Sequence, residues 1–274
     1  MTVQAAGALR PDSFLRRHSV LAYFLMTFAI SWLGALVVVA PALLRGHAVS
    51  KLSGILMFPA MLLGPSVSGI VMTRIVSRRD GVKDLFTRMR RARVPGRWYG
   101  VLLIPPVLVL SVLFFLKALV SPEFAPNQFW LGILFGVPAG FLEEIGWTGF
   151  AFPAMSAKGN RLRAAIVLGV LWATWHLPAI NFLGAAAPHG QYWVHFFLAF
   201  ALAMTAMRVV IAWLYVNTKS VLLAQLMHVS STGALVIFSP PVSAAQEAMW
   251  YAVYGCVLWA AVGVIVARGF RHDG

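Results

Sequence analysis

Long apolar runs separated by short polar links make up most of this chain. Eight runs are close to the roughly 20 residues that an α-helix needs to cross a bilayer. The links between them contain most of the Lys and Arg residues. This pattern predicts an all-α membrane bundle of about eight transmembrane helices. The predicted runs are 20–43, 53–75, 98–120, 129–152, 163–183, 192–215, 219–239 and 247–267.

The composition agrees with a membrane location. Of the 274 residues, 60% are hydrophobic and 11% are charged, whereas soluble domains average about 25% charged residues. No stretch is polar and long enough to form a soluble domain, so we expect one integral membrane domain over residues 1–274. The single cysteine, Cys256, excludes an intrachain disulfide and a cysteine-based metal cluster.

The formal net charge of +14 could indicate nucleic-acid binding. The basic residues, however, lie in the short links, as membrane topology requires, so we expect no nucleic-acid partner. With the N-terminus inside, eighteen of the 22 Lys and Arg residues are cytoplasmic, three are outside and Arg208 lies within a run. This split predicts a multi-pass cell-membrane protein with both termini in the cytoplasm. The topology would change if the short link 216–220 joined two runs into one re-entrant element.

One link, residues 77–97, is strongly basic. Its segment 84–93 has the pattern of a short amphipathic helix on the inner leaflet. One interpretation is docking of anionic lipid or of substrate. The other is an anchor that follows the positive-inside rule and has no further role.

Ionisable residues inside the predicted membrane segments are few, and such residues are functional candidates because burying them is costly. They are Glu143, Glu144, His176, His195, Arg208 and His228. At a rise of 1.5 Å per residue, the two glutamates, Arg208 and His228 lie on the order of 12–15 Å from the cytoplasmic helix ends, and His176 lies somewhat deeper. We therefore expect these five side chains in one layer. His195 lies near the outer end of its run and is interpreted as an interfacial histidine.

Two chemistries suit this set. Two histidines and a carboxylate could bind zinc as a His2Glu site. The same groups could activate water without a metal, with a glutamate as base and histidines that orient water and stabilise an oxyanion. The chain has no His-Glu-x-x-His motif, no Gly-x-Ser-x-Gly motif and no P-loop. These absences leave both chemistries open, without a required cofactor or with zinc.

Glu143 and Glu144 cannot share one role. Neighbouring residues of a helix point about 100° apart. We expect one carboxylate to face the reaction cavity and the other to contact a structural partner. Thr148, four residues after Glu144, is a hydroxyl donor on the same helix face.

Three motifs together resemble a known family. They are Glu143-Glu-Ile-Gly-Trp-Thr-Gly-Phe150, Leu171-Trp-Ala-Thr-Trp-His-Leu-Pro178 and Asn217-Thr-Lys-Ser-Val-Leu-Leu-Ala-Gln-Leu-Met-His228. In order and spacing they are similar to the CPBP family, the intramembrane glutamic endopeptidases related to the CAAX prenyl-protein endopeptidase, also called Abi proteins. The resemblance implies a catalytic core over residues 130–235, in which helices four to seven surround a conical cavity open to the cytoplasmic half.

The resemblance also implies roles for individual residues. Glu143 would activate the attacking water with help from His176, and His228 would stabilise the oxyanion. Glu144 would support the site. No metal is obligatory in this mechanism; if a metal does bind, its ligands would be Glu143, His176 and His228.

This sequence departs from the family pattern at three positions. Thr148 stands where the family usually has Arg, Trp172 where it has Phe, and Thr232 where it has Asn or Asp. We hypothesise that Arg208, at matching depth, replaces the missing arginine as the partner of Glu144. Thr232, or the neighbouring Ser231, could donate a hydroxyl in place of the Asn.

The predicted function is hydrolysis of peptide bonds in membrane-associated proteins or peptides, within the bilayer and near its cytoplasmic leaflet. Two other classes stay open. One is a proteolytically inactive relative that acts as a membrane scaffold or immunity factor. The other is a proton-coupled carrier, because buried Glu and His residues also form proton relays.

Overall fold

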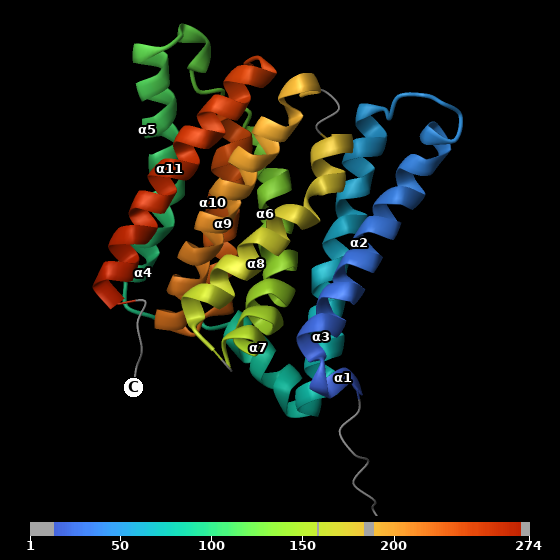
Figure 1. Ribbon diagram of the computed structural model, residues 1–274. Coiled ribbons are helices and arrows are strands. Elements are labelled where there is room, and N and C mark those ends of the chain that lie inside the picture. The colour runs from blue at the N-terminus through green and yellow to red at the C-terminus, as the bar shows by residue number, and fades with distance from the viewer. Residues whose placement is uncertain (1–13, 158, 184–188, 270–274) are drawn as a thin grey trace, which may run out of the picture.

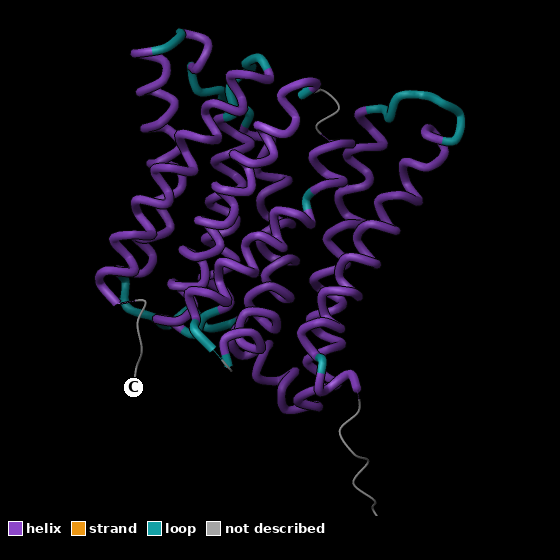
Figure 2. Tube along the Cα trace, in the orientation of Figure 1, coloured by secondary structure: helices purple, strands orange, loops and turns teal. Residues whose placement is uncertain are grey.

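The computed structural model describes residues 14–157, 159–183 and 189–269. Across these residues every regular element is helical (Figures 1 and 2), which confirms the predicted all-α class. The α-helices are α1 (Phe14–Arg17), α2 (Ser19–Leu43), α3 (Lys51–Met89), α4 (Arg97–Gly100), α5 (Ile104–Leu119), α6 (Ile133–Gly146), α7 (Phe152–Ser156), α8 (Arg161–Trp175), α9 (Trp193–Thr218), α10 (Val221–Phe238) and α11 (Ala244–Gly269). Short 3₁₀ turns are η1 (Val101–Leu103), η2 (Pro122–Phe124), η3 (Trp130–Gly132) and η7 (Gly190–Tyr192), and π-helical turns are η4 (Trp147–Ala151) and η5 (Ala179–Leu183).

Seven helical stretches in the described part of the chain are long and apolar enough to cross a membrane. This confirms a polytopic helical bundle, with seven such stretches where the sequence predicted about eight. They are Ser19–Leu43, Lys51–Met89, Arg97–Leu119, Arg161–Phe182, Gly190–Thr218, Val221–Phe238 and Ala244–Ala267.

The run that differs is the one that contains the two glutamates. The predicted helix 129–152 is divided into α6, the π-turn η4 and the five-residue α7, so no single helix in it is long. A π-turn inserts an extra residue into a helical turn and is often found at functional sites. Figure 1 shows this broken stretch in the middle of the bundle, beside α8 and α10.

The basic link 77–97 is mostly helical, which corrects its description as a loop. Helix α3 continues to Met89, with a kink at Arg78, where φ is 56° and ψ is −149°. The part of α3 after this kink runs across one end of the bundle (Figure 1). The predicted amphipathic helix is therefore present up to Met89, and only residues 90–96 link it to α4. Leu85 is fully buried and fixes this segment against the bundle.

Helices α9 and α10 are separate elements, so the link between them is not part of one re-entrant helix. Lys219 takes a left-handed conformation with φ of 53°, and the Ser220 hydroxyl caps α10 by accepting a hydrogen bond from the Leu223 amide at 3.1 Å. The chain reverses here, and α10 returns beside α9 (Figure 1). These two helices are the most enclosed of the seven.

Helices α6 and α10 approach each other closely because α6 has glycine at the contact. A Cβ added to Gly140 would lie 2.7 Å from the Gln225 carbonyl oxygen and 2.8 Å from the Val229 nitrogen. Small residues allow membrane helices to pack backbone against backbone. The close approach brings α10, with His228, against the part of α6 that carries the glutamates.

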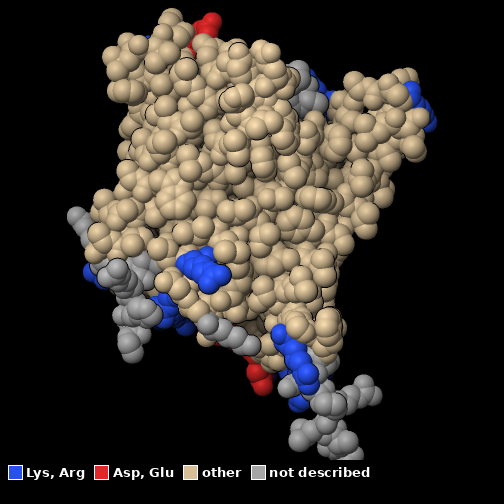
Figure 3. Space-filling view, viewed as in Figure 1, with Lys and Arg blue, Asp and Glu red and all other residues tan. Residues whose placement is uncertain are grey.

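Helix α1, the first in the described chain, begins at the end of the bundle where α11, the last, ends (Figure 1). Figure 3 shows Lys and Arg gathered mainly at the ends of the molecule, with a broad uncharged middle. Residues 1–13, Lys158 and residues 270–274 lie outside the described chain. The cytoplasmic placement of both termini therefore stays a prediction.

Candidate active site

Glu144 is the most heavily bonded side chain of the buried cluster. It is fully buried, and the guanidinium of Arg208 donates two hydrogen bonds to it, Nη1 to Oε2 and Nη2 to Oε1, each at 2.8 Å. Such bidentate pairs are the strongest ion pairs in both geometry and energy. The hypothesised pair between Arg208 and Glu144 is thus present.

Two further side chains complete the surroundings of Glu144. The Thr148 hydroxyl, from the π-turn, donates to Oε2, as the i+4 spacing predicted. His228 Nδ1, from α10, lies 2.8 Å from Oε1. Both carboxylate oxygens are therefore occupied, by groups from three separate elements.

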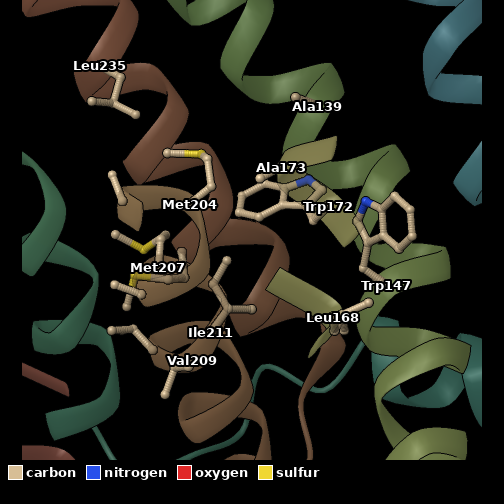
Figure 4. Packing of buried hydrophobic residues seen from close by; sticks show 14 of the residues in the cluster. Ala139, Trp147, Leu168, Trp172, Ala173, Met204, Met207, Val209, Ile211 and Leu235 are labelled. Atoms are coloured by element: carbon tan, nitrogen blue, oxygen red, sulfur yellow. The ribbon is translucent and has the colours of Figure 1, made fainter. Parts of the chain in front are cut away.

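Glu143 has different partners. Its side chain is 1% exposed, and the indole nitrogens of Trp147 and Trp172 both donate to its Oε2, at 3.1 Å and 2.8 Å. Figure 4 shows the two indoles beside each other with their nitrogen atoms on the facing sides. No described residue donates a hydrogen bond to Oε1. The two glutamates therefore have different partners within the described chain, and the expectation that one of them faces a reaction cavity stays a prediction.

His176 is placed by the end of a helix. It is the C-cap of α8, is half-buried, and its Nδ1 lies 2.7 Å from the Trp172 carbonyl oxygen. Because a carbonyl can only accept, Nδ1 carries the proton, and Nε2 of the neutral ring keeps a lone pair. The Trp172 ring also packs edge-on against both His176 and His228, with centroids 5.3 Å and 5.1 Å apart.

Within the described chain, neither histidine has a hydrogen bond to Glu143. His228 is bonded to Glu144 and His176 to the backbone of Trp172. Trp172 is the connecting residue, because its indole nitrogen bonds Glu143 and its ring faces both histidines. Arg208 also stacks on it, with the guanidinium carbon 4.2 Å from the ring centroid.

Two other predicted residues lie outside this hydrogen-bonded cluster. Thr232 is half-buried one turn beyond His228, and within the described chain neither it nor the buried Ser231 donates a hydrogen bond to the glutamates. Its role as a substitute for Asn stays a prediction. His195 is exposed on α9 beside Tyr192, at the edge of a groove between α9 and α11. It is separate from the cluster, as predicted.

Trp147 is the site residue that sequence reasoning missed. Its indole donates a hydrogen bond to Glu143. The available signal was its spacing of four residues from Glu143, which places both side chains on one helix face.

The described residues contain no group of three or more His, Cys, Asp or Glu side chains arranged to hold a metal ion. Of the two histidines in the described cluster, only His228 contacts a carboxylate, and its Nδ1 bonds the glutamate that Arg208 also pairs. The donor set of Glu143, His176 and His228 therefore does not have the arrangement of a ligand set.

The fold and the cluster define a class: an integral membrane protein that buries two carboxylates, two histidines and an arginine among apolar helices. A family model described as type II CAAX prenyl endopeptidase Rce1-like matches residues 125–233 of the chain, which contain all of these side chains. The CAAX prenyl protease 2 of Methanococcus maripaludis is 27% identical over 223 residues, which cover 75% of this chain and 80% of that protein. Both matches support the resemblance to the CPBP family of CAAX proteases that was noted in the motifs.

Proposed function

We propose that this protein is an intramembrane endopeptidase in which Glu143 activates water for attack on a peptide bond. The similarity to a family of CAAX proteases supports a hydrolase. The observation that carries the proposal is the division of labour between the two glutamates. Both oxygens of Glu144 are occupied by Arg208, Thr148 and His228, whereas Glu143 has an oxygen without a protein donor from the described chain.

The charges of the cluster support a role for His228. Two ionised carboxylates and one arginine leave a net charge of −1 in a buried site, and uncompensated buried charge is costly. A protonated His228 brings the cluster to neutrality. Its Nδ1–H then bonds Glu144, and its Nε2–H is free to donate to the oxygen of a substrate carbonyl. Glu144 and Arg208 would thus hold the imidazolium in place.

The reaction follows from these assignments. Water lies between Glu143 and His176 Nε2, which accepts a hydrogen bond from it. Glu143 takes a proton as the water oxygen adds to the scissile carbonyl carbon. The resulting oxyanion accepts a hydrogen bond from His228 Nε2. The proton on Glu143 then passes to the amide nitrogen, the C–N bond breaks, and an amine and a carboxylic acid leave.

We further propose that no metal is required. The lack of a ligand-like arrangement among the described His, Cys, Asp and Glu residues supports this. Extensive chelation, followed by metal analysis of the purified protein, should leave cleavage unchanged. Loss of cleavage on chelation, with recovery on addition of zinc, would contradict the metal-free mechanism.

The substrates are proposed to be membrane-associated proteins that reach helices α6 to α10 within a core of residues 130–235. The name of the archaeal relative indicates a prenylated CAAX substrate for that protein. Comparing a prenylated peptide, its unprenylated form and a bilayer-embedded peptide would identify the substrate class here. Faster cleavage of the prenylated peptide than of the other two would assign a CAAX substrate.

The decisive experiment replaces Glu143 with Gln, which keeps the shape of the side chain and removes the base. We expect cleavage to fall by roughly 10²–10⁴-fold, the usual contribution of a general base, with unchanged thermal stability in detergent. Glu123→Gln is the control, because Glu123 is exposed in η2, outside the cluster. Normal cleavage by Glu143→Gln would refute the proposal. A cellular phenotype that survives in Glu143→Gln would instead identify a non-proteolytic scaffold.

A further inference from the structure

We propose that the segment from Lys83 to Arg93 forms a binding site for the headgroup of an anionic phospholipid. The site lies at the end of the bundle where α3 runs across it (Figure 1). It is separate from the glutamate cluster, and the binding does not depend on the proposed peptidase activity.

Two adjoining hollows define the site. One, of about 390 Å³, is lined by Val82, Lys83, Phe86, Thr87 and Arg90. The other, of about 440 Å³, is lined by Thr87, Arg90, Arg91, Ala92 and Arg93. They share Thr87 and Arg90, so they form one continuous depression. Neither hollow has an acidic residue in its lining.

The arginines of this depression are available to an anion. Arg90, Arg91 and Arg93 are exposed, and none of them pairs with an acidic group of the described chain. The two aspartates of the segment are already engaged: Asp84 pairs with Arg88 at 2.7 Å, and Asp80 lies 3.8 Å from Lys83. Three uncompensated guanidinium groups around a hollow favour a phosphate, which they can bind in bidentate fashion.

The apolar part of the lining favours a lipid over free phosphate. Phe86 is 38% exposed, and Val82 lies one turn before it on the same side of α3. At the surface of a bilayer, these side chains would contact the acyl region while the arginines contact the headgroup. The positive-inside rule accounts for the basic charge of this end but does not require a hollow with apolar and basic sides.

The depression is held in a fixed position by backbone contacts. The Arg91 carbonyl accepts a hydrogen bond from the Ser220 hydroxyl at 2.6 Å, and the Ala92 carbonyl accepts one from the Tyr99 hydroxyl at 2.6 Å. Ser220 also caps α10, the helix that carries His228. A lipid bound here would thus rest on the residues that fix the start of α10.

The test is direct lipid binding to the full-length protein. The protein is placed in nanodiscs of phosphatidylcholine alone or mixed with phosphatidylglycerol in equal parts, and the lipid retained after extraction is identified by native mass spectrometry. The test variant is Arg90→Gln/Arg91→Gln/Arg93→Gln. The matched control, Arg45→Gln/Lys51→Gln/Lys117→Gln, removes three exposed basic residues elsewhere in the chain, from the α2–α3 link, the first turn of α3 and the last turn of α5.

We expect the unaltered protein and the control to retain phosphatidylglycerol selectively. Each arginine near an anionic surface contributes roughly a fivefold gain in affinity. The affinity of the triple variant for phosphatidylglycerol should therefore fall on the order of a hundredfold. The single variant Arg93→Gln, at an exposed position, should bind phosphatidylglycerol about fivefold more weakly. It replaces the triple variant in the test if the triple variant is unstable.

Three outcomes would overturn the proposal. The triple variant could retain phosphatidylglycerol as well as the unaltered protein does. The control could lose as much as the triple variant, which would indicate only general attraction of charge. Inorganic phosphate could displace the retained lipid from the unaltered protein and bind equally well in phosphatidylcholine nanodiscs, which would assign the hollow to a free anion. Because retention is measured without a peptide substrate, failure of the proposed peptidase function would leave these results unaffected.

Discussion

Arg208 and Glu144 are a buried pair whose value depends on both partners being present. Both side chains are at most 1% exposed, and both carboxylate oxygens receive a guanidinium nitrogen at 2.8 Å. Removing one partner of such a pair leaves a charge buried without compensation. Arg208 pairs with Glu144 in this chain, and Thr148 stands where the family resemblance leads us to expect an arginine. Loss of Arg208 tests whether Arg208 takes over the role of that arginine.

Replacing Arg208 with Leu should therefore destabilise the protein by roughly 3–5 kcal/mol and abolish cleavage. Thermal unfolding in detergent and a peptide-cleavage assay measure the two effects. Arg208→Lys should have a stability and a cleavage rate between those of the unaltered protein and of Arg208→Leu. Lysine keeps the positive charge but lacks the planar guanidinium that can bond both carboxylate oxygens. Wild-type stability and activity in Arg208→Leu would show that the pair has no role.

The double variant Glu144→Gln/Arg208→Leu separates folding from positioning. Removing both charges should restore much of the stability, because no uncompensated ion is left. Cleavage should stay low, since Glu144 also holds His228 Nδ1. Recovery of both stability and cleavage would mean that Glu144 does not position His228.

At the scale of the elements, the contact between α6 and α10 sets the distance between the glutamates and His228. Gly140→Ala would place a methyl group 2.7 Å from the Gln225 carbonyl oxygen. We expect a loss of roughly 1–3 kcal/mol, the usual cost of overpacking, together with reduced cleavage. Gly263→Ala in α11 is the matched control, because its Cβ would have no neighbour within 4 Å. Equal stability of the two variants would contradict the close approach of α6 and α10.

The part of α3 after its kink supports the π-turn from outside. Arg88 donates to the Gly149 carbonyl at 3.2 Å and to the Tyr215 hydroxyl at 2.9 Å, and a Cβ on Gly149 would meet Leu85 at 2.6 Å. This element therefore fixes the turn that follows the two glutamates. The turn carries Thr148, which donates to Glu144.

Arg88→Gln should lower the catalytic rate more than it raises KM, because it loosens the turn without touching substrate. A hydrogen bond to a charged group contributes roughly 1.5–3 kcal/mol, which sets the expected range for the loss of stability. The control is Arg79→Gln, an exposed position on the same segment. Identical rates for Arg88→Gln and Arg79→Gln would show that the contact with Gly149 is dispensable.

At the scale of the whole molecule, the links at the two ends of the bundle should lie on opposite sides of the membrane. Arg45 is in the link between α2 and α3, and Gly96 and Gly159 are in the links at the other end (Figure 1). In a variant with Cys256→Ala, single cysteines at these positions would react with an impermeant maleimide from one side only. We expect Gly96→Cys and Gly159→Cys to react from the cytoplasm and Arg45→Cys from outside. The reverse pattern would invert the predicted orientation.

The sequence was sufficient for the helical bundle and for the ionisable residues of the cluster, but not for Trp147. Apolar length identifies membrane helices, and distance along each helix gives depth, which is why Arg208 could be matched to Glu144. Depth does not give the rotation of a helix about its axis, because rotation is decided by packing against neighbours. For this reason the sequence did not predict that His228 contacts Glu144.

The pattern of apolar and polar residues also did not predict where the backbone departs from a regular α-helix. The kink at Arg78 lets α3 continue across the end of the bundle, where the charged sequence suggested a loop. The π-turn at Trp147–Ala151 divides a run that reads as one uninterrupted span. Each departure is stabilised by contacts with distant segments, such as Arg88 with Gly149, and periodicity contains no information about them.

The wide sequence separation within the cluster has a consequence for biogenesis. Arg208 follows Glu144 by 64 residues, and His228 follows it by 84. In the order of the chain, α6 precedes both cations, and an unpaired carboxylate is costly to bury in a bilayer. We therefore expect stable integration of α6 to await α9 and α10. A chain that is still being synthesised would lack the assembled cluster until its second half is inserted.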